Sequence, residues 1–256
     1  MASAWESKTQ KCRERYLTAS TYLSSRAFPS TLLSPTPSLA PSPDSHPVLL
    51  PGVDALNHAR GQPVSWAVST APNAPSSISL VLHNAHPAGA ELFNNYGPKP
   101  NAELILGYGF ALPHNPDDTI VLKLGGASAA QHAQHNNAVA GWEVGRGALG
   151  AEPVWEAVLA AVCDPDEEDE RTVEDELCAA DALEEMAQNL YDRLPKGPPE
   201  GALRPEVTHM LEHYLEGQRD ILQSLIQFAR DKAREAIRAA QELGLQVVDE
   251  EDEEEA

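Results

Sequence analysis

The sequence predicts an α+β fold, in which a leading helix and a β-rich region are followed by an α-helical region. Two observations support this division. Between residues 48 and 125, short apolar runs alternate with turn residues, which is typical of short strands. From about residue 130 onward, apolar residues recur at helical spacing, most clearly between Pro205 and Gly244. With 256 residues, the chain is long enough for one large domain or two small ones.

The negative charge is concentrated in two places. The formal net charge is −21, and nine acids fall within 164–176 while seven more occupy 249–255 without interruption. Such runs stay solvated, which suits solubility or a basic partner. The charge disfavours nucleic acid as a direct ligand, because phosphate binding needs clustered Lys and Arg.

Cysteine usage and hydropathy bear on the cellular compartment. Three scattered cysteines (Cys12, Cys163 and Cys178) indicate a reducing compartment rather than a disulfide framework. The N-terminal string MASAWESKTQ is polar, and no run of about 18 apolar residues occurs, so we expect no membrane span. These features favour a cytoplasmic or nuclear protein, which we expect to be a monomer.

The first half contains several short elements. Residues 1–28 are expected to form a helix preceding the β-rich core, since Trp5, Tyr16 and Leu23 recur at helical spacing. Residues 29–47 hold six prolines and five serines, which predicts a flexible inserted loop that builds no core. A hairpin loop is expected at 71–76, and Asn101 is expected to cap a short helix through Leu106. Strands are predicted at 48–50, 64–68, 78–82 and 120–124.

The second half, residues 130–245, is predicted to be helical. The expected helices cover 154–162, 174–194 and a long span from Pro205 to near Gly244, where Gly217 is expected to break or bend the helix. Residues 246–256 are expected to form a disordered acidic tail.

Two short motifs indicate the chemistry. Asn57-His58 is followed 31 residues later by the string GAELFNNYG (89–97), and Tyr96, Tyr108 and Phe110 place three aromatic rings within 15 positions. Methyl transfer to an amine depends mainly on alignment, which can supply about 7–11 kcal/mol. An apolar aromatic slot lowers the pKa of an entering lysine and attracts both ammonium and sulfonium groups. The motifs therefore suit the alignment of a methyl donor with an amine.

The motifs resemble those of a known family. LPGVDALNH (50–58) and GAELFNNYG (89–97) are similar to the paired motifs of SET-domain protein-lysine N-methyltransferases. Three further strings resemble the branch of the Rubisco large-subunit and ribosomal-protein lysine methyltransferases. They are SRAF (25–28), NAELILGYGF (101–110) and YLEGQRDIL (214–222).

The resemblance implies roles for seven residues and for both regions. Tyr96 would be the catalytic tyrosine, near both the methyl group and the amine. S-adenosyl-L-methionine would be bound by Asn57, His58, Tyr96 and Phe110. The lysine channel would be lined by Arg26, Phe28 and Tyr108. Residues 48–125 would be the C-terminal half of a SET domain, and residues 130–245 would dock a protein substrate, such as a basic or ribosomal protein.

One part of the family pattern is not found. The family has a glycine-rich turn near the start of its SET domain, which binds the methionine part of the cofactor, whereas no glycine precedes Gly52 here. We therefore expect an N-terminally truncated SET protein. The second hypothesis is a catalytically incomplete SET protein that acts as a protein-binding module.

Four features have simpler interpretations. Arg26 is either a channel residue or a plain helix-end cation. Glu91 is expected to make a structural hydrogen bond rather than to act as a general acid. The histidine pairs 132/135 and 209/213 lack partners at a zinc-enzyme spacing, so no metal site is predicted.

Overall fold

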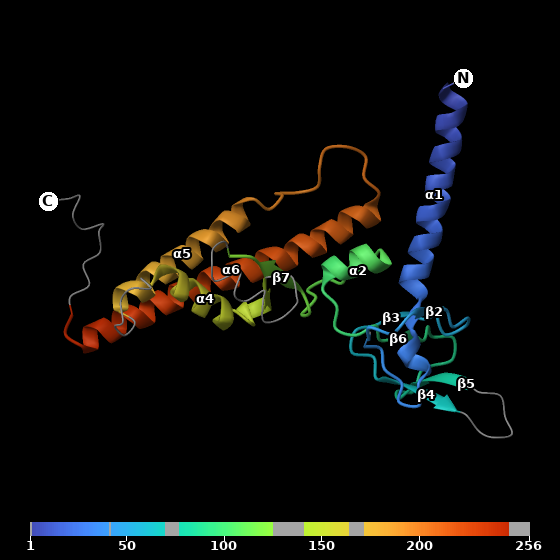
Figure 1. Cartoon of the computed structure of the whole chain (residues 1–256), viewed down its shortest axis with the longest axis horizontal. Coiled ribbons are helices and arrows are strands. Elements are labelled where there is room, and N and C mark those ends of the chain that lie inside the picture. Colours follow the sequence, from blue (N-terminus) through green and yellow to red (C-terminus); the bar gives the residue numbers. More distant parts are fainter. Residues whose placement is uncertain (1, 41, 70–76, 125–140, 164–171, 246–256) are drawn as a thin grey trace. The chain divides into compact units, whose positions relative to one another are not determined.

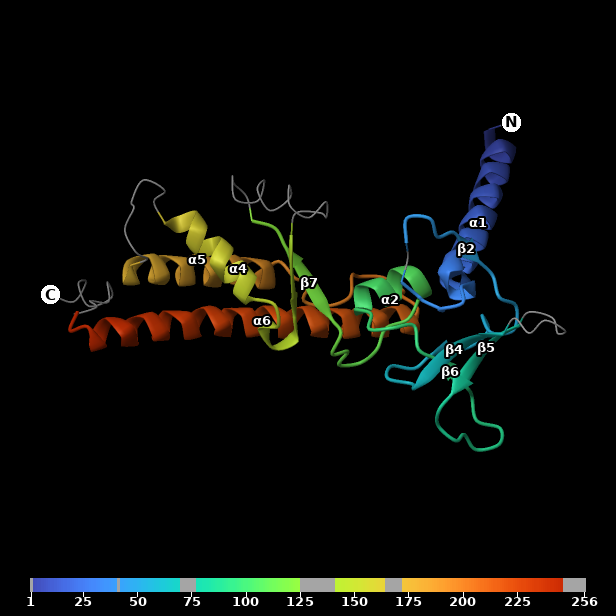
Figure 2. The same cartoon turned by 60° about the horizontal axis from the view of Figure 1, so that its bottom comes forward.

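The computed structural model describes residues 2–40, 42–69, 77–124, 141–163 and 172–245, and the chain forms two compact units (Figures 1 and 2). The first unit comprises Met1–Lys99 with Glu103–Gly109, and the second comprises Pro100–Ala102 with Phe110–Ala256. The second unit thus begins before the composition change that the sequence shows at 125–130.

The first unit begins with α1 (Ala2–Arg26), which confirms the expected helix. Between residues 10 and 24 the expected apolar stripe does not pack on a core, because these side chains are all exposed, including Tyr16 at 72%. Within residues 10–26, whose side chains the structure describes, burial begins only in the last turn. That turn carries Arg26 and leads directly into β1 (Phe28–Pro29).

The Pro/Ser-rich stretch is more ordered than predicted. The 3-10 helix η1 (Ser30–Leu33) follows β1, and β1 pairs antiparallel with β2 (Pro47–Val48). Leu32 is fully buried, and the Thr31 hydroxyl donates a hydrogen bond to the Ser38 carbonyl at 2.9 Å. The prediction that this stretch builds no core is wrong at Leu32, and its flexibility stays a prediction. Composition did not reveal that one leucine among prolines would be buried.

Two strand pairs follow. β3 (Asn57–His58) pairs in parallel with β6 (Phe93–Asn94), with Asn57 opposite Phe93 and His58 opposite Asn94. β4 (Val64–Ser69) and β5 (Ser77–Leu82) form the antiparallel pair that the alternating pattern predicted, as Figure 2 shows. The loop expected at 71–76 lies outside the described residues.

Helix α2 (Asn101–Tyr108) extends two residues beyond the predicted end and ends at Gly109, whose φ is +77°. The Asn101 side chain does not cap α2, because it forms hydrogen bonds with Leu112 and Asp118 instead. The carboxylate of Asp118 accepts the Asn101 backbone N–H at 2.7 Å. A residue 17 positions later therefore satisfies the first donor of α2.

The second unit is mainly helical. It contains the three predicted helices as α4 (Glu152–Val162), α5 (Val173–Asp192) and α6 (Pro205–Glu242). It also contains β7 (Thr119–Leu122), which pairs antiparallel with β8 (Trp142–Gly145), followed by the 3-10 helix η2 (Arg146–Ala148). β8 lies in the region predicted to be helical, and its four residues are too few to show a period of two.

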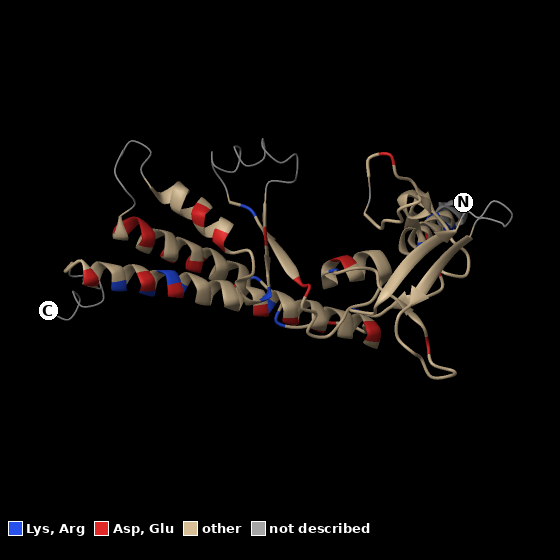
Figure 3. Ribbon diagram, turned by 90° about the horizontal axis from the view of Figure 1, so that it is seen from below, with Lys and Arg blue, Asp and Glu red and all other residues tan. Residues whose placement is uncertain are grey.

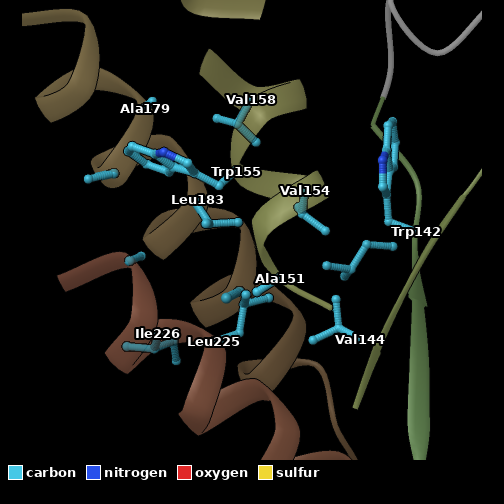
Figure 4. Close-up of a cluster of buried hydrophobic side chains, with 14 of the residues drawn as sticks. Trp142, Val144, Ala151, Val154, Trp155, Val158, Ala179, Leu183, Leu225 and Ile226 are labelled. Atoms are coloured by element: carbon cyan, nitrogen blue, oxygen red, sulfur yellow. The ribbon is translucent and has the colours of Figure 1, made fainter. Parts of the chain in front are cut away.

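The main hydrophobic core lies between these elements (Figure 4). Side chains from the β7–β8 hairpin and from all three helices meet there, and α5 and α6 run side by side. The fully or nearly fully buried members include Leu122, Trp142, Val144, Val154, Trp155, Val158, Leu159, Leu183, Ile221 and Leu225. Trp142 and Trp155 both lie in this core of the second unit, so tryptophan fluorescence can report on the exposure of the core when the chain unfolds.

Gly217 neither breaks nor bends α6, contrary to the prediction, because the helix is continuous across it. A Cβ placed on Gly217 would lie 2.3 Å from Oδ2 of Asp118. The glycine is therefore needed for the close approach of Asp118 to the helix, a contact that the local sequence does not reveal.

Charge is predominantly negative along α5, whereas α6 carries both acidic and basic side chains (Figure 3). The first turn of α5 alone carries Glu174, Asp175 and Glu176. None of the helices in the described ranges combines the length and the apolar character that a membrane span needs. Within those ranges no cluster of three potential metal ligands occurs. The pair 132/135 and the tail 246–256 fall outside them.

Candidate active site

Four of the predicted site residues line one pocket in the first unit. The pocket has a volume of about 130 Å³, and its walls include Arg26, Phe28, Tyr96 and Tyr108. The end of α1 presents Arg26, and β1 begins with Phe28. Tyr108 is the last residue of α2. All of the predicted lysine-channel residues therefore meet the predicted catalytic tyrosine.

The parallel pairing of β3 with β6 brings the two motifs together. Tyr96 follows β6 by two residues, and its backbone N–H donates to Nδ1 of His58 at 3.0 Å. The Tyr96 hydroxyl donates to the Leu56 carbonyl at 2.8 Å. Leu56 directly precedes Asn57-His58, and His58 ends that pair. These two residues thus bind the hydroxyl and the backbone N–H of Tyr96.

His58 acts here as an acceptor. Because the Tyr96 N–H points at Nδ1, that nitrogen is unprotonated while the bond exists, and the ring proton lies on Nε2. The His58 and Tyr96 rings lie 5.1 Å apart, and the Tyr96 and Tyr108 rings 4.9 Å apart. The three rings form a continuous aromatic wall.

Burial raises the pKa of Tyr96 above its ordinary value of 10.0, while the Arg26 guanidinium lowers it and the neighbouring Tyr108 raises it. The hydroxyl is therefore neutral at physiological pH. Since its hydrogen is committed to the Leu56 carbonyl, the Tyr96 oxygen can act toward a ligand only as an acceptor.

Arg26 is more than a helix-end cation. Its guanidinium donates to the Asp54 carbonyl at 2.8 Å and to Oδ1 of Asn57 at 3.4 Å. The Asn57 amide in turn donates to Oε1 of Glu91 at 2.8 Å, which is the structural hydrogen bond expected of that glutamate. The Asn57 side chain is thus held on one side by Arg26 and on the other by Glu91.

The remaining predicted residues are placed differently. Asn57 and His58 do not line the pocket, although both bond residues that do. Phe110 belongs to the second unit, so its expected place near the cofactor stays a prediction.

The pocket residues that the sequence analysis did not assign include Asn94, Asn95 and Lys99. Asn94 is buried, and its side chain accepts the Asn95 backbone N–H at 2.7 Å. Asn95 accepts the Gly97 N–H at 3.0 Å, so the two amides shape the turn that presents Tyr96. Their position directly before Tyr96 is a signal that could have identified them.

Parts of the chain are similar in sequence to known lysine methyltransferases. No family model matches the chain. However, 81 residues are 47% identical to the ribosomal lysine N-methyltransferase set10 of Schizosaccharomyces pombe, covering 32% of this chain and 14% of that protein. A further match is the N-lysine methyltransferase SETD6 of Homo sapiens, 34% identical over 80 residues, covering 30% of this chain and 16% of that protein.

Over these segments the chain is similar in sequence to SET-domain lysine methyltransferases. Its fold agrees with theirs. The structure of Rubisco LSMT bound to AdoMet matches with a TM-score of 0.58 at 19% identity, over 94% of this chain and 61% of that one. Rubisco LSMT bound to sinefungin and monomethyllysine matches with a TM-score of 0.55 at 21% identity, over 93% and 60%. The predicted α+β fold and the resemblance to this SET-domain branch are confirmed.

This chain spans only part of the length of the relatives that it matches. The curated matches cover 14% and 16% of those SET-domain relatives, and the structural matches 60–61% of the solved chains. The activity of the whole relatives therefore has to be argued for this chain from its own residues.

Proposed function

We propose that the chain carries part of an S-adenosylmethionine-dependent protein-lysine N-methyltransferase site that acts on a non-histone protein. The observation that carries the proposal is the pocket that joins Arg26, Phe28, Tyr96 and Tyr108. The relatives named above support this function over a protein-binding module without catalysis.

The residues present suit a sulfonium methyl donor. The aromatic faces of Tyr96 and Tyr108 attract a cation, and the His58 imidazole lies beside Tyr96 through the bond that it accepts from the Tyr96 N–H. We propose that Asn57, His58, Tyr96 and Phe110 hold S-adenosylmethionine. That molecule would supply a methyl group carried on positively charged sulfur.

The chain itself would orient the amine. With its hydrogen bonded to Leu56, the Tyr96 oxygen accepts a hydrogen bond from a lysine amine or a weak C–H···O contact from a methyl group. The Arg26 guanidinium disfavours a further cation beside it, so it favours the neutral, nucleophilic amine. Phe28 and Tyr108 would guide the side chain of the lysine.

The second unit would hold the protein substrate. Its acidic helix α5 suits a basic partner, and ribosomal proteins are one such class. We propose that the protein acts in the cytoplasm or nucleus, in keeping with its free cysteines.

Tyr96→Phe tests the proposal. Methyl transfer from labelled S-adenosylmethionine to a mixture of ribosomal proteins should be abolished, because the acceptor oxygen is lost, while the thermal midpoint stays nearly unchanged. Tyr22→Phe, an exposed tyrosine on α1, is the matched control and should retain activity. Unimpaired turnover by Tyr96→Phe would remove Tyr96 from the active site.

A further inference from the structure

The pocket already contains an ammonium group. Lys99 lines it together with Tyr96 and Tyr108, and its Nζ lies 5.8 Å from the centroid of the Tyr108 ring. This distance is within the range of a cation–π interaction. The Lys99 side chain is only 19% exposed, and its ammonium is paired with the Glu103 carboxylate one helical turn later.

We propose that Lys99 is an internal occupant of the lysine pocket and competes with an incoming lysine for the face of Tyr108. The inference rests on the proposed function, because it takes the pocket to be the place where a substrate lysine is bound.

A third cation does not enter this pocket easily. Arg26 already supplies one positive charge to the wall, and Lys99 supplies a second. An entering lysine side chain would bring its nitrogen to the same aromatic surface that the Lys99 ammonium uses. In a partly buried site like charges at such distances repel strongly, so the ligand has to displace Lys99.

Glu103 can hold the Lys99 ammonium when a ligand displaces it from the pocket. The carboxylate is 49% exposed and lies in the first turn of α2, so it can keep the ammonium as a partner outside the pocket. Exposed ion pairs are weakly held, so this displacement costs little. Lys99 would thus reject weakly bound amines and admit a lysine that a docked protein presents.

The test is a titration of free Nε-monomethyl-L-lysine into the full chain and its variants. Lys99→Met keeps the unbranched apolar stem and removes the charge, so it should bind the probe about two- to fivefold more tightly, the equivalent of one exposed cation–π contact. Lys99→Arg keeps a cation and should bind no tighter than the wild type. Lys196→Met, at an exposed site in the second unit, is the matched control.

A measurement on the wild type complements the variants. The ε-methylene signals of Lys99 should lie upfield because of the Tyr108 ring current, and saturation with the probe should move them downfield. This readout decides the matter even if Lys99→Met fails to fold. Equal or weaker binding by a folded Lys99→Met, unmoved Lys99 signals, or no probe binding by either protein would overturn the proposal.

A parallel titration with S-adenosylmethionine separates the two proposals. If the cofactor binds but Lys99→Met leaves probe affinity unchanged, the role of Lys99 fails alone. If the cofactor does not bind while Lys99→Met tightens probe binding, the role of Lys99 is supported and the proposed cofactor use fails.

Discussion

At the scale of single residues, Tyr96 depends on contacts that are distant in sequence. Its N–H is bound by His58 and its hydroxyl by Leu56, 38 and 40 positions earlier. The motif identified Tyr96 as the residue to examine. That its hydroxyl is a donor to a backbone carbonyl, and therefore an acceptor toward a ligand, follows only from the pairing of β3 with β6.

Gly217→Ala should destabilise the protein although alanine has the higher helix propensity, because the added Cβ would clash with Asp118. Asp118 is only 2% exposed and is held by Asn101 and Arg146, so it cannot move away from an added Cβ. Gly217→Ala should lower the free energy of unfolding by about 1–3 kcal/mol. Urea denaturation followed by far-UV circular dichroism measures it.

The control is Gly107→Ala in α2, where a Cβ meets nothing within 4 Å. Without a clash, this change should raise the unfolding free energy by about 0.5–1 kcal/mol through helix propensity. Stabilisation by Gly217→Ala would contradict the proposed close approach of Asp118.

Glu216 gives a prediction about pH. The hydrogen bond from Arg146 holds the pKa of the Glu216 carboxyl below its ordinary 4.5, against the opposing effect of burial. The unfolded state therefore binds the proton more readily. The stability from this pair is present above pH 4.5 and is lost as the pH falls through the lower, folded-state pKa.

Protonation of the neighbouring Asp118 affects stability in the opposite direction. Burial raises the pKa of its carboxyl, so acidification favours the folded state. Glu216→Gln separates the two. Its unfolding free energy should fall less than that of the wild type between about pH 5 and about pH 3. Glu212→Gln, an exposed glutamate on the same helix, should keep the wild-type slope. A Glu216→Gln slope equal to that of the wild type would be evidence against the Arg146 pair.

At the scale of elements, local signals determine how α5 begins. Thr172 and Asp175 form a reciprocal capping box, in which the Thr172 hydroxyl accepts the Asp175 N–H at 3.1 Å and the Asp175 carboxylate accepts the Thr172 N–H at 2.9 Å. Thr172→Ala should therefore cost about 0.5–2 kcal/mol of unfolding free energy.

Thermal or urea denaturation of the second unit, followed by tryptophan fluorescence, measures this cost. Thr208→Ala removes a partly buried threonine within α6, whose hydroxyl donates only a long hydrogen bond of 3.4 Å to the Arg204 carbonyl, and should change the free energy by less than about 0.5 kcal/mol. Equal effects of the two substitutions would mean that the capping box does not contribute to α5.

The sequence predicted elements well where the pattern was long or repeated. The long helix from Pro205 and the alternating strands β4 and β5 fall within a few residues of their predicted bounds. β8 was missed because four residues show no period, and the burial of Leu32 was missed because it depends on tertiary packing. Local pattern carries no information about such partners.

At the scale of the whole molecule, the predicted α+β fold agrees with the solved Rubisco LSMT structure over 94% of the chain. The two compact units do not divide where the composition changes, because the second already begins at Pro100 and takes in β7 and β8. For the site, motif spacing identified the residues that meet in the pocket, but not Lys99 beside Tyr108, because a lysine between two prolines has no distinctive pattern.

The most direct test of the central proposal is a calorimetric titration of S-adenosylmethionine into the purified chain. We expect saturable binding with a Kd below the millimolar range. Tyr96→Phe should keep most of this affinity, since the substitution removes one acceptor and leaves the aromatic face in place. Absence of binding below the millimolar range would contradict the assignment of a methyltransferase site to this chain.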